Sequence, residues 1–144
     1  MRPALSSWWR DDYNSRMKIF RGEAVPAQLA DSQSFVGRAR TQRLASADDG
    51  VPVVVYSVDF EDGARTNWHA HSGPQWLLIV GGRVRVQTWG EPAEEVGAGD
   101  AVMVAPHEKH WHGAAPGSRA SHLAVNVNFT TEWFEPVSDD EYGR

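Results

Sequence analysis

Short alternating runs separated by turn residues constrain this chain more than any other feature of its sequence. From Phe35 onward, apolar and polar residues alternate over short stretches, and glycine, proline and aspartate stand between them. Alternation with a period of two places one face of a strand against a core, and frequent turns join antiparallel neighbours. The pattern predicts an all-β domain, a sandwich or small barrel of the jelly-roll type without a long helix. The expected strands are residues 35–44, 51–60, 68–71, 76–80, 83–89, 101–105, 110–112 and 122–129.

One turn is predicted from a glycine pair. Gly81 and Gly82 lie between two of the expected strands. Adjacent glycines can both adopt positive φ without steric cost, and two such residues are a typical hairpin connection. We therefore expect a two-residue hairpin that joins residues 76–80 to residues 83–89.

The first 34 residues differ in character from the rest of the chain. They carry no clean period, and Trp8 and Trp9 lie between serines and a charged stretch. We expect residues 1–34 to form an N-terminal arm and residues 35–144 to form a single domain. Because a small β-sandwich leaves sheet edges that need covering, and the arm has no core of its own, we also expect a homodimer.

Composition excludes several classes of function. The chain has 144 residues, the length of one ordinary domain. It has no cysteine, which excludes thiolate metal ligands and cysteine nucleophiles. The net charge is −5, and the 14 lysines and arginines are scattered, so nucleic acid is not an expected partner. The longest apolar run, residues 76–80, is too short to cross a membrane, and we expect a cytoplasmic protein without a membrane partner.

All six histidines lie between His69 and His122. His69 and His71 are two residues apart, and His110 and His112 repeat that spacing. In a strand, residues two apart point to the same face, so each pair can converge on one ion. His122 begins a further strand of alternating character. Two such pairs in one small β domain favour a metal site over ordinary surface or core histidines.

These residues resemble the motifs of the cupin family. The first motif, a glycine followed by H-x-H, a glutamate and a second glycine, is similar to Gly63, His69, His71, Gln75 and Gly82, with glutamine in place of the glutamate. The second motif is similar to Gly99-Asp100, Val102, Val104, Pro106 and His110. The segments GARTNWHAH, EKHWHGAAP and SHLA resemble small single-domain cupins that include bacterial manganese-dependent hydroxynitrile lyases. In size the chain is also similar to the cupin polyketide cyclases of secondary metabolism. The resemblance implies a single-domain cupin jelly roll over about residues 35–130.

Carried over position by position, the resemblance makes His69, His71, Gln75 and His110 the metal ligands. It places His112 and His122 in the cavity near the metal, where they are the candidate catalytic residues. The sequence departs from the general pattern in three ways. Gln75 stands in place of glutamate, the spacing from Pro106 to His110 is one residue shorter, and His107 occupies the position of a glycine.

A ligand set of three imidazoles and one amide is neutral. It would leave the charge of one divalent ion per chain uncompensated by protein and so make that ion a strong Lewis acid. Coordination by three nitrogens and one oxygen suits octahedral Mn, Fe, Co or Ni, whereas Zn would more naturally keep three histidines and one water. The residues do not distinguish among these metals.

Aromatic residues near the histidines bear on the substrate. Trp68, Trp76, Trp89 and Trp111 lie on expected strands, where they either wall a pocket for a small apolar or aromatic molecule or pack in ordinary fashion. On the last strand, His122, Ala124, Asn126 and Asn128 share one face, and Phe129 lies on the other. The asparagines can contact substrate if their face lines the cavity.

The leading hypothesis is a metal-dependent lyase or cyclase that makes or breaks a carbon–carbon bond next to a carbonyl or hydroxyl group. Hydroxynitrile lyase chemistry and aldol-type polyketide cyclisation are both examples, with the metal as Lewis acid and His112 or His122 as the base. Two alternatives remain open. One is an Fe(II)-dependent cupin dioxygenase that uses the same ligands, and the other is a non-catalytic cupin that only binds a ligand.

Overall fold

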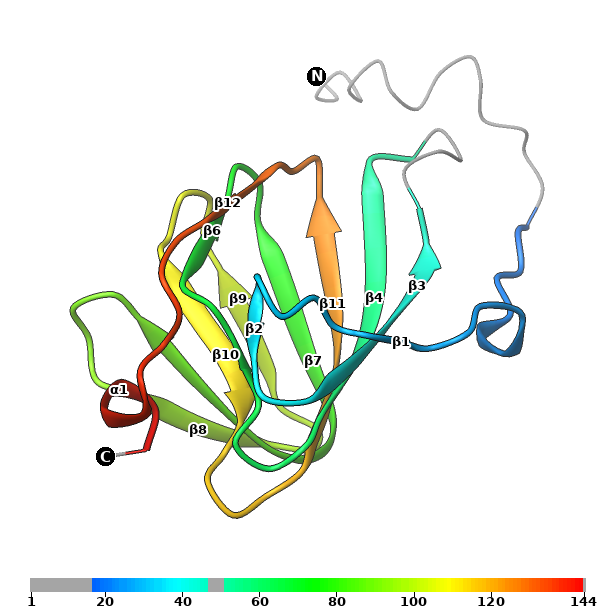
Figure 1. Ribbon diagram of the computed structural model, residues 1–144. Helices are drawn as coiled ribbons and strands as arrows, with labels where there is room; N and C mark the ends of the chain where they lie inside the picture. Colours follow the sequence, from blue (N-terminus) through cyan, green and yellow to red (C-terminus); the bar gives the residue numbers. More distant parts are fainter. Residues whose placement is uncertain (1–16, 47–50, 144) are drawn as a thin grey trace.

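The computed structural model describes residues 17–46 and 51–143, and nearly all of their regular structure is β (Figure 1). Within these residues the helical elements are a short 3-10 turn, η2 (Gly22–Ala24), and one helix, α1 (Asp139–Gly143), which agrees with the absence of a predicted long helix. The all-β prediction is confirmed. The strands are β1 (Gln28–Leu29), β2 (Phe35–Val36), β3 (Ala39–Ala45), β4 (Val53–Phe60), β5 (Arg65–Thr66), β6 (His69–His71), β7 (Gln75–Thr88), β8 (Glu94–Gly97), β9 (Ala101–Val104), β10 (His110–Ala114), β11 (Ala120–Val127) and β12 (Thr131–Trp133).

The strands form one sheet that curls into a half-barrel (Figure 1). Its main path runs β1-β3-β4-β11-β7-β10-β5-β2, and all the strand pairs are antiparallel. Two further strands pair with β7, namely β8 and β9, while β6 pairs with both β10 and β12. Strand β7 therefore belongs to both walls of the half-barrel, and β10 carries one pair of histidines on its inner face.

The predicted hairpin at Gly81 and Gly82 is wrong, because β7 continues through both glycines. The first half of β7 pairs with β9 and β11, and its second half pairs with β8 and β10. Gly82 has φ +64°, and a Cβ atom there would collide with the carbonyl oxygen of Arg119. The register of β11 shifts between Ser121 and His122 at the same place. The glycines thus allow one strand to bend between two walls rather than to reverse.

The main core lies inside the curl, between the two walls. It contains Phe60, Leu77, Ile79, Val84 and Ala114 among its buried members. On β4 and β7 the core residues alternate with exposed or half-buried residues, as a period of two requires, whereas β10, which carries Ala114, is buried along its whole length. Within residues 17–46 and 51–143, no helix is long and apolar enough to cross a membrane.

Part of the expected N-terminal arm joins the sheet. Strand β1 pairs with β3 through Gln28 with Thr41 and Leu29 with Arg40. Trp8 and Trp9, which suggested the role of the arm, lie outside the described residues. The boundary at residue 34 therefore stays a prediction, but residues 28–34 already contact the domain.

Candidate metal centre

Three histidines meet where β6 crosses between β10 and β12. His69 is paired with His110 across β6 and β10, and His71 is paired with Thr131 across β6 and β12. One nitrogen from each of His69, His71 and His110 lies within 4.8 Å of the others. The ring centroids of His69 and His110 are 4.2 Å apart. Neighbouring strands thus bring together residues that are 41 positions apart in the sequence.

Hydrogen bonds at the outer nitrogens set the orientation of two of these rings. Nδ1 of His69 donates to the carbonyl oxygen of Asn67 at 2.9 Å, and Nδ1 of His110 donates to that of Glu108 at 2.8 Å. A carbonyl can only accept, so each Nδ1 carries the proton and each Nε2 presents a lone pair inward. This is the arrangement that orients histidine ligands in metal proteins.

Gln75 completes the cluster. Its Oε1 lies 3.2 Å from Nε2 of His110, and its Nε2 donates to Oδ1 of Asn126 at 2.9 Å. Nδ1 of His71 contacts the hydroxyl of Thr131 at 3.0 Å, while Nε2 of His71 is buried without a partner among the described residues. The lone pairs of Gln75 Oε1 and His110 Nε2 therefore face each other with no proton between them. A cation fits this donor set, since it would satisfy all of these atoms at once.

Burial keeps the three imidazoles neutral. Desolvation is the main cause that lowers the pKa of His69 well below its ordinary value, and the pKa of His110 is also lowered, chiefly by burial. The pKa of His71 falls to about 4, first through desolvation and then through the nearby charge of His110. Neutral imidazole is the form that binds a metal ion. The described structure therefore holds His69, His71, Gln75 and His110 as a neutral set of three nitrogens and one oxygen.

The turn before His110 tolerates its departure from the family pattern. His107, which stands where a glycine is usual, is exposed and adopts φ +64°. Its backbone N–H donates to the carbonyl oxygen of His71 at 2.7 Å. Positive φ costs energy in any residue other than glycine. Here the turn keeps that conformation, and through this bond it ties β6 to the start of β10.

His112 and His122 form a buried pair next to the cluster. Nδ1 of His112 and Nε2 of His122 are 2.9 Å apart and share one hydrogen bond. Nε2 of His112 and Nδ1 of His122 are buried without partners among the described residues. Burial lowers the pKa of His112 well below its ordinary value and that of His122 to about 4. Of the two, His112 lines the cavity described next.

A cavity of about 300 Å³ opens beside these residues. His69, His71, Gln75 and His112 form part of its lining, and Asn126 lies beside them on β11. The aromatic part of the lining comes from Phe35, Tyr56, Phe129 and Trp133. A cavity that combines aromatic side chains with convergent polar groups is typical of a small-molecule site.

The four tryptophans predicted as candidate walls do not line this cavity. Trp68 and Trp111 are buried in a separate cluster with the C-terminal segment, on the other face of β10. Trp76 and Trp89 are about half exposed. Two of the four tryptophans thus pack in a core and two are partly exposed. The tryptophan that lines the cavity is Trp133.

Phe129 is predicted to lie on the face opposite to Asn126, but both residues line the cavity. Strand β11 ends at Val127, and Asn128 adopts φ +44°, which interrupts the alternation. As a result Asn128 is exposed, and the ring of Phe129 lies 5.5 Å from that of His71. Asn126 is buried and faces the cavity, as one reading of the strand pattern allowed.

Sequence reasoning missed Phe35, Tyr56 and Trp133 as cavity residues. The sequence pattern could have identified Tyr56, because it is two residues from both Val54 and Val58 and so shares the inner face of β4 with them. The signal for Trp133 was not, because β12 is only three residues long and its position depends on its pairing with β6.

Several known proteins are similar to this chain in sequence or in fold. A family model described as a cupin domain matches residues 56–126. The chain is 42% identical over 131 residues to (R)-mandelonitrile lyase of Granulicella tundricola, a match that covers 89% of this chain and 100% of the relative. A cupin-like protein from Thermotoga maritima has a TM-score of 0.77 at 36% identity, over 79% of this chain and 89% of that one. The polyketide cyclase RemF from Streptomyces resistomycificus has a TM-score of 0.69 over 88% and 91% of the two chains, and at 21% identity this likeness shows the fold alone. The chain therefore belongs to the cupin family.

Proposed function

We propose that this cupin is a metal-dependent lyase that cleaves the carbon–carbon bond between the hydroxyl-bearing carbon and the nitrile of a small aromatic cyanohydrin. One observation carries the proposal. The neutral lone pairs of His69, His71 and Gln75 and the unpartnered Nε2 of His112 belong to side chains that line the same cavity. The likeness to (R)-mandelonitrile lyase, which covers all of that relative, supports this choice of substrate class.

The residues that would hold the metal are His69, His71, Gln75 and His110. A divalent ion bound there would supply Lewis-acid stabilisation for negative charge that develops on the substrate oxygen. Because all four ligands are neutral, the protein itself would cancel none of the charge of that ion.

His112 is the proposed base. When its Nδ1–H donates to Nε2 of His122, its own Nε2 carries the lone pair on the cavity side. That nitrogen accepts the hydroxyl proton of the cyanohydrin, and the electron pair of the O–H bond forms the carbonyl. The pair of the broken carbon–carbon bond leaves with cyanide, which takes the proton back from His112. The products are an aldehyde and hydrogen cyanide, and His112 returns to its starting state.

Aromatic side chains account for the expected substrate class. The rings of Phe35, Phe129 and Trp133 line the cavity and bury an aromatic ring away from water. The ring centroid of Trp133 lies 4.8 Å from that of His69, so an aromatic substrate that packs on Trp133 lies next to the histidine cluster.

The test uses protein stripped of metal and reloaded with Mn, Fe, Co, Ni or Zn in separate preparations. Release of benzaldehyde from (R)-mandelonitrile is followed by absorbance, and oxygen is monitored in the same cell. We expect benzaldehyde with at least one metal, no oxygen uptake, and a loss of about 10²- to 10⁴-fold in His112→Ala. The matched control is His107→Gly, which removes an exposed histidine and should leave the rate unchanged. Oxygen consumption would support the dioxygenase alternative instead, and binding without turnover would support the binding alternative.

A further inference from the structure

Several polar side chains of the cavity lining take no part in the proposed chemistry. The hydroxyl-bearing residues Ser34, Thr41 and Tyr56 all belong to its lining. Among the described residues, the structure gives no hydrogen bond to any of these three side-chain hydroxyls, whereas the hydroxyl of Thr66 accepts the backbone N–H of His112. Three hydroxyl-bearing side chains thus line the cavity, and among the described residues none of their hydroxyls has a hydrogen-bond partner.

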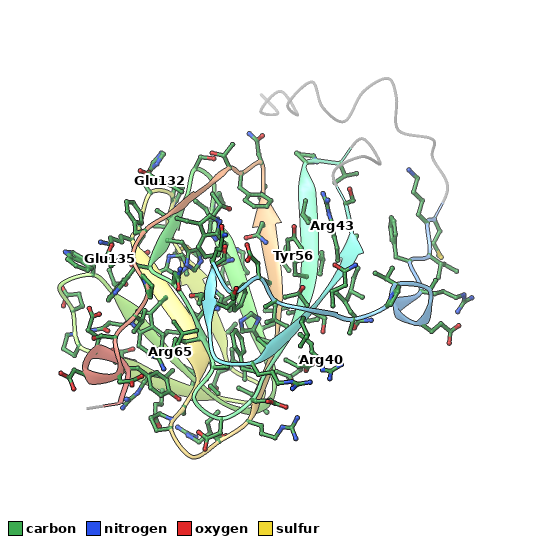
Figure 2. All side chains as sticks on the ribbon, viewed as in Figure 1. Arg40, Arg43, Tyr56, Arg65, Glu132 and Glu135 are labelled. Carbon is green, nitrogen blue, oxygen red and sulfur yellow. The ribbon has the colours of Figure 1, made fainter. Side chains whose placement is uncertain are left out.

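Tyr56 is the best-placed of the three to contact a substrate. Its ring packs against the main core, which fixes the side chain, and Figure 2 shows it on the inner side of the curled sheet. On β4, Tyr56 pairs with Ala124 of β11, and Ala124 in turn pairs with Leu77 of β7. Ala124 is small and also lines the cavity, so it leaves the space in front of the tyrosine open.

Tyr56 and the candidate metal ligand Gln75 lie on different strands. β4 lies two strands from β7, where Gln75 is located, which is about 10 Å across the sheet at the usual strand spacing. The aromatic residues Phe35, Phe129 and Trp133 also belong to the lining. The cavity lining therefore includes candidate metal ligands, aromatic rings and hydroxyl-bearing side chains.

A plain phenyl ring would match this cavity poorly. It would cover the hydroxyl of Tyr56 without offering it a partner, and a buried polar group without a partner costs free energy. A ring that carries its own hydroxyl would restore the hydrogen bond. Sites built to bond a substrate hydroxyl discriminate strongly against analogues that lack it.

From this arrangement we infer that the substrate of this chain is an aromatic cyanohydrin whose ring carries a hydroxyl group away from the reacting carbon, and that Tyr56 recognises that hydroxyl. The inference rests on the proposed lyase function and adds the substrate class to it. Tyr56 acts as a specificity-determining residue, since it contacts the substrate without taking part in bond breaking.

The experiment compares mandelonitrile with 4-hydroxymandelonitrile in wild type, in Tyr56→Phe and in the control Ser57→Ala. Ser57 is the next residue of β4 and lies outside the cavity lining. We expect kcat/KM in wild type to be about tenfold higher for the hydroxylated substrate, the effect of one additional hydrogen bond. In Tyr56→Phe, kcat/KM should fall for the hydroxylated substrate and stay the same for mandelonitrile, so that most of the preference is lost. Ser57→Ala should keep the preference. Equal kcat/KM for both substrates in wild type, or an unchanged ratio in Tyr56→Phe, would overturn the inference.

A second readout separates this inference from the proposed function. Binding of benzaldehyde and 4-hydroxybenzaldehyde is measured by calorimetry without any turnover. Tighter binding of the hydroxylated aldehyde that disappears in Tyr56→Phe supports the role of Tyr56 even if neither cyanohydrin is cleaved, a result that would reject the lyase proposal alone. Cleavage of both cyanohydrins with no binding preference would reject the role of Tyr56 and leave the lyase proposal standing.

Discussion

The metal-free protein should lose stability steeply as the pH falls below about 6.5. Burial is the largest cause that lowers the pKa of His69, His71, His110, His112 and His122, and for His71 and His122 the pKa is about 4. The ordinary value in an unfolded chain is 6.5. Below that pH the unfolded chain takes up protons that the folded protein does not bind, so acid favours unfolding. At pH 8 these histidines are neutral in both states and contribute nothing to the pH dependence.

The size of the effect follows from the two pKa values. At pH 5, a histidine with a pKa of about 4 when folded and 6.5 when unfolded lowers the free energy of unfolding by about 2 kcal/mol relative to pH 8. His71 and His122 together give about 4 kcal/mol, and the three other buried histidines act in the same direction. Domains of this size are stable by about 5–15 kcal/mol. The metal-free protein should therefore come close to its unfolding transition near pH 5.

The assay is urea denaturation followed by tryptophan fluorescence at pH 8, 6.5, 5.5 and 5. His107→Gly is the control, because it removes a histidine that is exposed and does not belong to the buried set. Saturation with a divalent metal should move the loss of stability to lower pH, since a ligand that binds only the folded state stabilises it and competes with protons. An unfolding free energy that stays constant from pH 8 to pH 5 in the metal-free protein would refute the reasoning.

Four further predictions test the site and the assembly. His110→Ala should lose most of its bound metal by elemental analysis, because the remaining ligands are neutral; a full metal equivalent in this variant would show that His110 is not a ligand. Gln75→Glu should bind metal more tightly in a titration of the metal-free protein and react more slowly at saturation, because a carboxylate cancels part of the charge of the ion; no change in either quantity would show that Gln75 does not contact the metal. His112→Ala should keep its metal while turnover falls, and joint loss of both would reject its role as base. The homodimer expected from the sequence should appear in light scattering as a particle of twice the chain mass, and deletion of residues 2–16 should shift it toward the monomer; a monomeric wild type would contradict this expectation.

The candidate ligands could be predicted from the sequence because their placement depends on local rules. Strand alternation puts His69 and His71 on one face, and it does the same for His110 and His112. The family resemblance then added Gln75, which the structure places 3.2 Å from His110. The shared face within each histidine pair depends only on the local strand conformation and not on distant segments of the chain.

Other parts of the site depend on contacts between distant segments. The role of Gly82 follows from the approach of Arg119 on the neighbouring segment, which the glycine pair alone does not reveal. The positive φ of Asn128 brings Phe129 to the cavity together with Asn126, although alternation placed these two residues on opposite faces. Trp133 reaches the cavity because β12 pairs with β6. Sequence patterns therefore located the reactive groups better than the walls that select the substrate.

The most direct test of the central claim is a titration of the metal-free protein with a divalent metal, in which the rate of benzaldehyde release from (R)-mandelonitrile is measured at each addition. A metal-dependent lyase whose single site is formed by His69, His71, Gln75 and His110 predicts a rate that starts near zero, rises in proportion to added metal and stops rising at one ion per chain. A rate that is already full without metal, or that stays at zero after the site has been saturated with each of Mn, Fe, Co, Ni and Zn, would contradict it.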